Sequence, residues 1–248
     1  MGGDKVKHYG KVSVKVTRPL GVQEASGLAP AAHGAFFVVD DERGVFHCAP
    51  DGDLINIDVG EGLTDLESIA ITPDGKHALV LAEHDGGIWR FSVEDDDLRD
   101  GERLGSLPRL SGKKNQGWEG IAFAAAGTVA EHMELVAVHQ VKPRRIGLFD
   151  AQTLKQRSLL RLPKNARKAI GELNDVAMDA GGRILLLSGK SGRIAEMRLE
   201  DEALSLVRVY RIESSEDDVP EGICIDAEGR VWLCTDGKGI LYQLELEA

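Results

Sequence analysis

Short runs of apolar residues alternate with polar turn signals along the whole chain, and no stretch requires a helix. The clearest case begins with an apolar run at residues 68–71, turns at Pro-Asp-Gly-Lys, and continues in a second run at 78–82. After another turn at 85–87, the residues of 88–91 alternate between apolar and polar. The pattern predicts an all-β chain of short antiparallel strands.

One short motif recurs five times and gives these strands a period. Each copy has an acidic or small polar residue, a small or turn-prone residue, and then a β-prone apolar run. The equivalent positions are Ser26, Glu67, Glu119, Asn174 and Glu221. They are separated by 41, 52, 55 and 47 residues. A period of roughly 40 to 50 residues is typical of propellers and solenoids. With one blade for each copy, the sequence predicts a five-bladed β-propeller.

The number of strands per repeat predicts how the ring closes. Four repeats offer four strand candidates each, whereas the fifth offers three before the chain ends. The alternating segment at about 11–17 precedes the first motif and has no other partner, so we expect it to complete the last blade and cover its edge. A sixth blade is the competing interpretation. We therefore expect a flexible N-terminus at 1–10 and a single domain of four-stranded antiparallel blades at 11–248.

Charge narrows the classes of partner. The chain has a net charge of −11, and the acidic runs at 94–97 and 216–218 are expected to be solvated loops. Nucleic acid is a poor partner for so acidic a chain, since the basic pairs 113–114 and 144–145 are too short to form a basic stripe. We expect a monomer that binds no nucleic acid.

Neither a membrane span nor a disulfide framework is expected. No apolar run approaches the ~20 residues that a spanning helix needs. The first residues lack the apolar core of a signal peptide, which fits a cytoplasmic protein; if a leader has been removed, the location is periplasmic or membrane-anchored. The odd set Cys48, Cys224 and Cys234 has no regular spacing, and the last two fall in apolar runs, where a free thiol packs as a small hydrophobe.

The ordered set of motifs resembles a known family. Glu-Ala-Ser-Gly-Leu at 24–28, Asp-Leu-Glu-Ser-Ile at 65–69, Asn-Gln-Gly-Trp-Glu-Gly-Ile-Ala-Phe at 115–123 and Pro-Glu-Gly-Ile at 220–223 are similar to those of the SdiA-regulated (YjiK-like) proteins. The resemblance implies a five-bladed β-propeller, distantly related to NHL-repeat propellers, with a calcium ion at a shared site. It implies no established activity. Asn174-Asp175 departs from the family, which tends to have Ser-Gly there.

The repeated acids suggest a metal at the propeller axis. First strands line the central channel, so Glu67, Glu119 and Glu221 are expected to converge there. Carboxylates at close range raise one another's pKa unless a cation joins them. Ligands that are all oxygen suit Ca²⁺. The remaining candidate ligands are Glu24 and Glu172, two residues upstream of the equivalent positions, and Asp175. The alternative is that each acid only caps a turn at the entry to its blade.

A second set of polar residues follows the second strand of each blade, where loops on a rigid scaffold carry binding groups. The candidate ligand-binding residues are Asp41, Glu83, Gln140, Lys190 and Asp236. The candidate bases are His84, His139 and Asp40. Each of these, taken singly, also fits an ordinary polar loop tip. The chain has no Gly-x-Ser-x-Gly, phosphate-loop or His-Glu-x-x-His motif, so nucleophilic catalysis is not supported.

Two functions remain as hypotheses. The first is a calcium-binding propeller that binds a small-molecule or protein ligand at its channel mouth. The second is a calcium-dependent hydrolase of lactones, esters or phosphoesters, in which the ion polarises the reacting oxygen. An open coordination position beside a base would favour the hydrolase, whereas an ion saturated by protein oxygens would favour the binding module.

Overall fold

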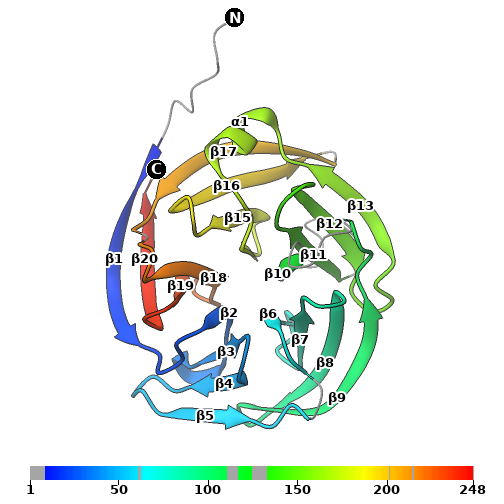
Figure 1. Ribbon diagram of the computed structural model, residues 1–248, viewed down its shortest axis with the longest axis vertical. Helices are drawn as coiled ribbons and strands as arrows, with labels where there is room; N and C mark the ends of the chain where they lie inside the picture. Colours follow the sequence, from blue (N-terminus) through cyan, green and yellow to red (C-terminus); the bar gives the residue numbers. More distant parts are fainter. Residues whose placement is uncertain are drawn as a thin grey trace, which may run out of the picture.

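A computed structural model describes residues 9–60, 63–110, 117–124, 133–200, 202–213 and 215–247. The basic pair at 113–114, the motif residues 115 and 116, and positions 1–8 of the expected flexible N-terminus lie outside the described residues. The chain is all-β and forms a β-propeller, with its sheets arranged around a central axis (Figure 1). No helix in the described part of the chain has the length and apolar character of a membrane span.

Three antiparallel sheets have four strands each, hydrogen-bonded in sequence order from the axis outward. The first contains β2 (Ala25–Pro30), β3 (Phe36–Asp40), β4 (Gly44–Cys48) and β5 (Leu54–Ile57). The second contains β6 (Leu66–Ile71), β7 (His77–Ala82), β8 (Gly87–Glu94) and β9 (Asp97–Ser106). The third contains β10 (Trp118–Ala124), β11 (Glu134–His139), β12 (Arg145–Asp150) and β13 (Gln156–Arg161).

The fourth sheet has eight strands in the order β14-β15-β16-β17-β1-β20-β19-β18. One half contains β14 (Asp175–Met178), β15 (Arg183–Ser188), β16 (Arg193–Glu200) and β17 (Ala203–Arg211). The other half contains β18 (Val219–Ile225), β19 (Val231–Asp236), β20 (Ile240–Glu247) and β1 (Tyr9–Pro19). The two halves meet where β1 pairs in parallel with β17 at Tyr9 and Gly10.

The N-terminal strand pairs with the C-terminal one, as the sequence predicted. β1 is antiparallel to β20 from Lys11 opposite Glu247 to Pro19 opposite Ile240, with a register shift between Val14 and Val16. This pairing is longer than the predicted segment 11–17. It supplies the outermost strand beside β20, which covers the hydrogen-bonding edge that β20 would otherwise expose.

The inner strands form a closed ring around the axis. β2 contacts β6, β6 contacts β10, β10 contacts β14, β14 contacts β18, and β18 contacts β2. Apolar side chains fill the wedges between neighbouring sheets; for example, Val39 and Val80 belong to one buried cluster. Trp118 is part of this core, with Phe149 against it at 5.4 Å between ring centroids. All three cysteines are free and buried.

Two expectations about local structure were wrong. The segment Lys164–Ala169 forms the α-helix α1, because Ala166 and Ala169 pack inward and its lysines and arginine are good helix formers. Six residues are too few to show a helical repeat in the sequence. A single 3-10 turn also lies at Ala32–Gly34. The acidic run 94–97 was expected to be a loop, but only Asp95 and Asp96 form a turn, both at positive φ. Strand β9 begins at Asp97, earlier than the start at residue 102 that the apolar pattern suggested.

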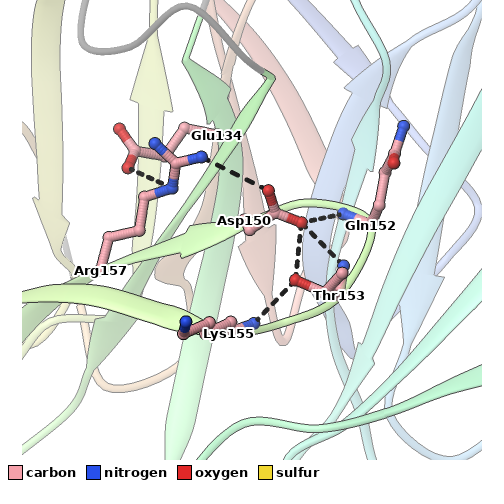
Figure 2. A network of polar contacts seen from close by, with 6 residues as sticks. All are labelled: Glu134, Asp150, Gln152, Thr153, Lys155 and Arg157. Atoms are coloured by element: carbon pink, nitrogen blue, oxygen red, sulfur yellow. Dashed lines mark hydrogen bonds and ion pairs between the residues drawn. The ribbon is translucent and has the colours of Figure 1, made fainter.

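The hairpin between β12 and β13 is closed by a polar network (Figure 2). One oxygen of Asp150 accepts hydrogen bonds from Thr153 Oγ1 at 2.7 Å, from Thr153 N at 2.9 Å and from Gln152 N at 3.2 Å. These bonds, led by the Thr153 hydroxyl, lower the pKa of Asp150 to about 2. Arg157 lies between Asp150 and the buried carboxylate of Glu134. No signal in the sequence singles out this network, since its members belong to no repeat.

Candidate functional site

Four of the five equivalent positions of the sequence repeat lie at backbone irregularities near the start of the inner strands. The pairing register shifts between the two neighbours of Ser26, of Glu67, of Glu119 and of Glu221, so each of these residues is a β-bulge. Asn174 comes directly before β14, and its N–H donates to Leu187 O at 3.0 Å. A bulge re-aims the side chain it carries. The repeat in the sequence therefore corresponds to a repeated β-bulge that re-aims one side chain in each of four inner strands.

Three of these bulge residues are glutamates that lie close together. Burial, followed by the charges of Glu83 and Asp65, raises the pKa of Glu67 to about 8. Burial, followed by the charges of Glu67 and Glu83, raises the pKa of Glu119 well above its ordinary value, and only 7% of Glu119 is exposed. Burial also raises the pKa of Glu221 to about 8, and Glu221 lies near enough to raise the pKa of the other two.

Asn174 supports this group with an amide in place of a fourth acid. Its Nδ2 donates to Glu221 Oε2 at 2.6 Å, and its Oδ1 accepts from Gly189 N at 2.8 Å. The position where the chain departs from the resembled family therefore holds Glu221 in place by a hydrogen bond. Because the amide donor stabilises the charged carboxylate, it lowers the pKa of Glu221 against the effect of burial.

Two further acids, from the segments beside β6 and β7, join the glutamates. Asp65, Glu67 and Glu83 each offer a carboxylate oxygen, and these atoms lie within 4.8 Å of one another. Glu83 Oε1 accepts from Gly117 N at 3.1 Å, and the Glu83 side chain hydrogen-bonds that of Glu119. Asp65 was missed by the sequence reasoning, and Glu83 was expected to bind a ligand rather than a metal. The signal available was that Asp65 lies two residues before the equivalent position Glu67, just as Glu24 and Glu172 lie two residues before theirs.

The donor set fits a hard cation. Every donor in this acidic mouth (Asp65, Glu67, Glu83, Glu119 and Glu221) is a carboxylate oxygen, the ligand type that Ca²⁺ prefers. Among the described residues, the Glu119 Oε1 atom is buried without a hydrogen-bond partner. Buried polar atoms are normally paired, so this carboxylate oxygen among other acids is one that a cation would fit.

Asp175 lies one residue beyond the bulge position and has a different environment. It is fully buried; Oδ1 accepts from Ser68 Oγ at 3.1 Å and Oδ2 from Ile223 N at 2.8 Å. Burial raises its pKa well above the ordinary value. Both oxygens are thus engaged within the protein, so Asp175, which the sequence proposed as a metal ligand, serves here to link β14 with β6 and β18.

Small residues occupy the four positions that match Asp175, and at Gly120 the small residue leaves room for it. These positions hold Gly27, Ser68, Gly120 and Gly222. A Cβ atom on Gly120 would lie 2.5 Å from Asp175 Cα and 2.5 Å from its Oδ1, so only glycine fits there. The sequence contains a signal for this role of Asp175, because it is the one larger side chain among four small ones at equivalent positions. The sequence reasoning did not use it.

Beyond Asp175 the channel becomes apolar. A cavity of about 210 Å³ is lined by the later residues of all five inner strands. The lining residues include Leu28, Ile69, Ile121, Val176 and Ile223. Charged groups therefore gather at one end of the axis, and the other end is hydrophobic.

A second acidic group lies beside β2 and β3. Glu24, Asp40 and Asp41 bring carboxylate oxygens within 4.8 Å of one another. Asp40 is buried and fully used, because Oδ1 accepts from Arg43 N at 2.8 Å while Oδ2 is paired with the Arg43 guanidinium at 2.9 Å. The charge of Glu42 and a hydrogen bond with Asp41 raise the pKa of Glu24. Glu24 therefore groups with Asp40 and Asp41, and the charge of Asp41 contributes to the raised pKa of Glu67 and of Glu221.

The second polar set does lie at the same end of the channel as the bulge residues. In each sheet the end of the second strand pairs with the start of the first: for example, His139 is opposite Trp118 and Asp236 is opposite Val219. Gln140 joins neighbouring loops through its backbone, since its carbonyl accepts from Leu173 N at 3.2 Å. Lys190, with Glu172 and Glu221, lines a cavity beside the mouth. Burial raises the pKa of Asp236.

The candidate bases differ sharply in environment. His139 is 1% exposed and packs edge-on against Trp118 at 5.4 Å between ring centroids. Burial lowers the pKa of His139, which keeps the imidazole neutral. His84 is exposed in the turn between β7 and β8. Asp40 is held by Arg43, as described above. Of the three candidate bases, His84 is the one that solvent reaches freely.

Comparisons with known proteins agree with the fold. A family model described as SdiA-regulated matches residues 10–244. A search of curated proteins gave no match. The structure is similar to a Myxococcus xanthus glutaminyl cyclase, with a TM-score of 0.69, 13% identity, and coverage of 98% of this chain and 99% of that one.

Two other similar structures have different roles. One is a PQQ-bound aldose sugar dehydrogenase from Streptomyces coelicolor, with a TM-score of 0.62, 14% identity, and coverage of 96% of this chain and 98% of that one. The other belongs to a nidogen–laminin complex, with a TM-score of 0.57, 12% identity, and coverage of 86% and 73%. At these identities the similarity shows the fold alone, and enzymes and a protein-binding assembly share it.

Proposed function

The chain belongs to the SdiA-regulated family, and we propose that it is a calcium-binding five-bladed propeller that binds a ligand or partner at its channel mouth. The observation that carries the proposal is the orphaned oxygen of Glu119, buried among acids whose charges raise one another's pKa. A bound cation would satisfy this oxygen and remove the repulsion.

The closed ring of inner strands supports five blades. β2, β6, β10, β14 and β18 each begin one four-stranded unit, and each contacts the next around the axis. On this interpretation the eight-stranded sheet is two blades joined at their outer edges, because β1 contacts β17 in parallel over only two residue pairs. The ring also supports a single domain over residues 11–248.

The acids of the mouth would hold the ion. Asp65, Glu67 and Glu83 already bring oxygens together, and Glu119 and Glu221 lie within electrostatic reach of Glu67. Ca²⁺ takes six to eight oxygens in flexible geometry, so these acids with ligand or water oxygens suffice. When bound, the ion would supply positive charge that attracts oxygen-bearing groups to the mouth. Burial raises the pKa of Glu67 and Glu221 to about 8, so these acids would be fully deprotonated at neutral pH only with the ion bound.

The remaining mouth residues fit recognition. Asp41, Gln140 and Lys190 follow the second strands of three of the four-stranded units, Asp236 ends the second strand of another, and the set carries charges of both signs. Loops fixed on a rigid scaffold in this way can select a partner without large movement.

The hydrolase hypothesis has weaker support from the candidate bases. His139 is buried against Trp118, and Asp40 is saturated by Arg43 and the turn that follows it. His84 alone is exposed. A base must come within hydrogen-bond reach of the water it activates, so the hydrolase would depend on His84.

Calcium titration of the metal-free protein tests the proposal directly. Calorimetry should give saturable binding for the natural chain. The double variant Glu67→Gln with Glu119→Gln should bind at least about 100-fold more weakly, because two charged ligands are lost.

The matched control is Glu94→Gln with Glu200→Gln, which removes the same two charges from exposed positions on outer strands. Its affinity for calcium should equal that of the natural chain. Equal weakening in both double variants, or unchanged affinity in the Glu67/Glu119 pair, would refute the site. A lactone and ester panel with and without chelator separates the alternatives: turnover that chelator abolishes, and that His84→Gln also abolishes, would replace the binding module with the hydrolase.

A further inference from the structure

Five cationic side chains line one cavity, although the chain as a whole has a net charge of −11. The cavity has a volume of about 590 Å³ and lies where α1 meets the β11–β12 loop and the start of β16. The other lining residues are apolar or small, and none is acidic. The cations of this basic pocket are Lys142, Arg144, Arg167, Lys168 and Arg193.

The pocket has a fixed frame. The Arg144 guanidinium donates to the carbonyls of Arg167, Ile170 and Gly171, and Arg193 donates to that of Ala169. Arg144 of the β11–β12 loop and Arg193 at the start of β16 therefore hold the C-terminal end of α1. The partial negative charge of the carbonyls there favours cations. This arrangement places Arg167 and Lys168, both exposed on α1, over the cavity.

The charges of the pocket are not neutralised by acids. Among the described residues, none of its five cations forms an ion pair with a carboxylate; the pairs that the structure contains involve other side chains. Burial and the charge of Arg167 lower the pKa of Arg144. Like charges held this close repel one another, and a bound anion would relieve the repulsion.

We propose that the basic pocket binds the phosphoryl group of a small ligand. Guanidinium forks match phosphate oxygens in pairs, and lysine adds a mobile point charge. A phosphoryl group carries a charge of about −1.5 to −2 at neutral pH, which offsets several cations better than the single charge of a carboxylate. Arg167 and Lys168 supply mobile donors above the cavity, and Arg144 and Arg193 form its fixed wall.

The pocket adjoins the channel mouth. A neighbouring cavity shares Ser191 and Arg193 with it and extends to Glu172 and Glu221. A ligand anchored by its phosphoryl group could therefore extend its other end toward the mouth. This extension rests on the proposed calcium site, whereas phosphoryl binding in the pocket does not.

The test uses the full chain, treated with chelator so that the calcium site plays no part, in chloride buffer. Inorganic phosphate and glycerol phosphate are titrated by calorimetry, and amide shifts of Gly171 and Ser191 are followed by NMR. We expect saturable binding with shifts at both amides. Arg167→Gln with Lys168→Gln should raise the Kd at least about tenfold, because two charge-assisted contacts are lost.

Lys164→Gln with Arg161→Gln is the matched control, since it removes two exposed cations next to the pocket but outside its lining. Its Kd should stay within about twofold of the natural chain's. A third arm uses vesicles of phosphatidylcholine with phosphatidic acid. If neither soluble phosphate binds, the proposal is wrong, even if the protein sediments with the vesicles. Equal weakening in the control also overturns it, since the effect would then be one of overall charge.

Discussion

Glu67 and Glu221 are buried carboxyl groups whose pKa is raised to about 8 in the metal-free protein. An unfolded chain titrates such groups near pH 4.5, so between about pH 4.5 and 8 the folded state holds more protons than the unfolded state. The stability that these two groups contribute is fully present below about pH 4.5 and is lost as the pH rises through 8. Metal-free protein should therefore melt at a lower temperature at pH 8 than at pH 5.

The same groups predict proton release on calcium binding. Because the ion requires ionised carboxylates, binding at pH 7 should expel at least about two protons, from Glu67 and Glu221. Calorimetry in buffers of different ionisation enthalpy measures this number. At pH 9.5, where both groups are already ionised, the release from these two groups should fall toward zero. A proton count of zero at pH 7 would contradict the raised pKa values.

At this scale the sequence predicted the site only in part. Glu67, Glu119 and Glu221 could be found because they recur at one phase of a repeat. Asp65 had a weaker signal, its place two residues before the equivalent position, and the role of Glu83 depends on its contact with Gly117, just before β10 of the next sheet. The cations of the basic pocket come from three separate segments. The pair Arg144-Arg145 by itself is too short to form a basic stripe, so it did not indicate the pocket.

Among the elements, the inner strands are distinguished by how closely they approach one another. A Cβ atom on Gly222 would lie 2.8 Å from Gly27 Cα and 2.6 Å from Cys234 Sγ. Glycine at these positions lets the backbones of β18 and β2 come together. The ring of strands therefore depends on residues with no side chain.

Adding one methyl group at this contact should be costly. Gly222→Ala is expected to lower the free energy of unfolding by roughly 1–3 kcal/mol, because backbone atoms of β2 cannot move aside easily. Urea unfolding followed by circular dichroism measures the change. Gly171→Ala, whose Cβ would meet nothing nearer than 3.8 Å, is the control and should shift stability by less than about 0.5 kcal/mol. Similar losses of stability in both variants would mean that the close approach of the inner strands does not cause the loss in Gly222→Ala.

The strands themselves were the most predictable elements, since their apolar runs and turn residues are local signals. Residues 134–139, for example, form β11 nearly where the apolar run 135–138 placed it. The helix α1 was missed because its six residues show no periodicity, and β9 was predicted too short because an acidic run was interpreted as a loop. The bulges could be located only by phase, because a sequence does not show which residue of a motif is left unpaired.

For the molecule as a whole, the pairing of β1 with β20 closes the ring. The two strands pair over most of their length, and Val12 packs against the buried cluster that contains Leu244. Without β1, the edge of β20 would be open to other chains.

Removing residues 1–19 should therefore destabilise the propeller and make it self-associate. We expect a lower melting temperature and larger species in size-exclusion chromatography. A synthetic peptide of the sequence of β1 (Tyr9–Pro19) should restore the monomer-sized peak by strand addition, and a scrambled peptide should not. A truncated chain that melts and elutes like the natural one would show that the closure contributes nothing to stability.

The same closure has a consequence for biosynthesis. Ser13 and Glu245, which are hydrogen-bonded across β1 and β20, are 232 residues apart in the chain. Ribosomes add about 5–20 residues per second, so β1 waits roughly 10 to 50 s for its partner to be made. During that interval the nascent chain exposes an unpaired strand, and we expect chaperones that hold extended segments to engage it until translation ends.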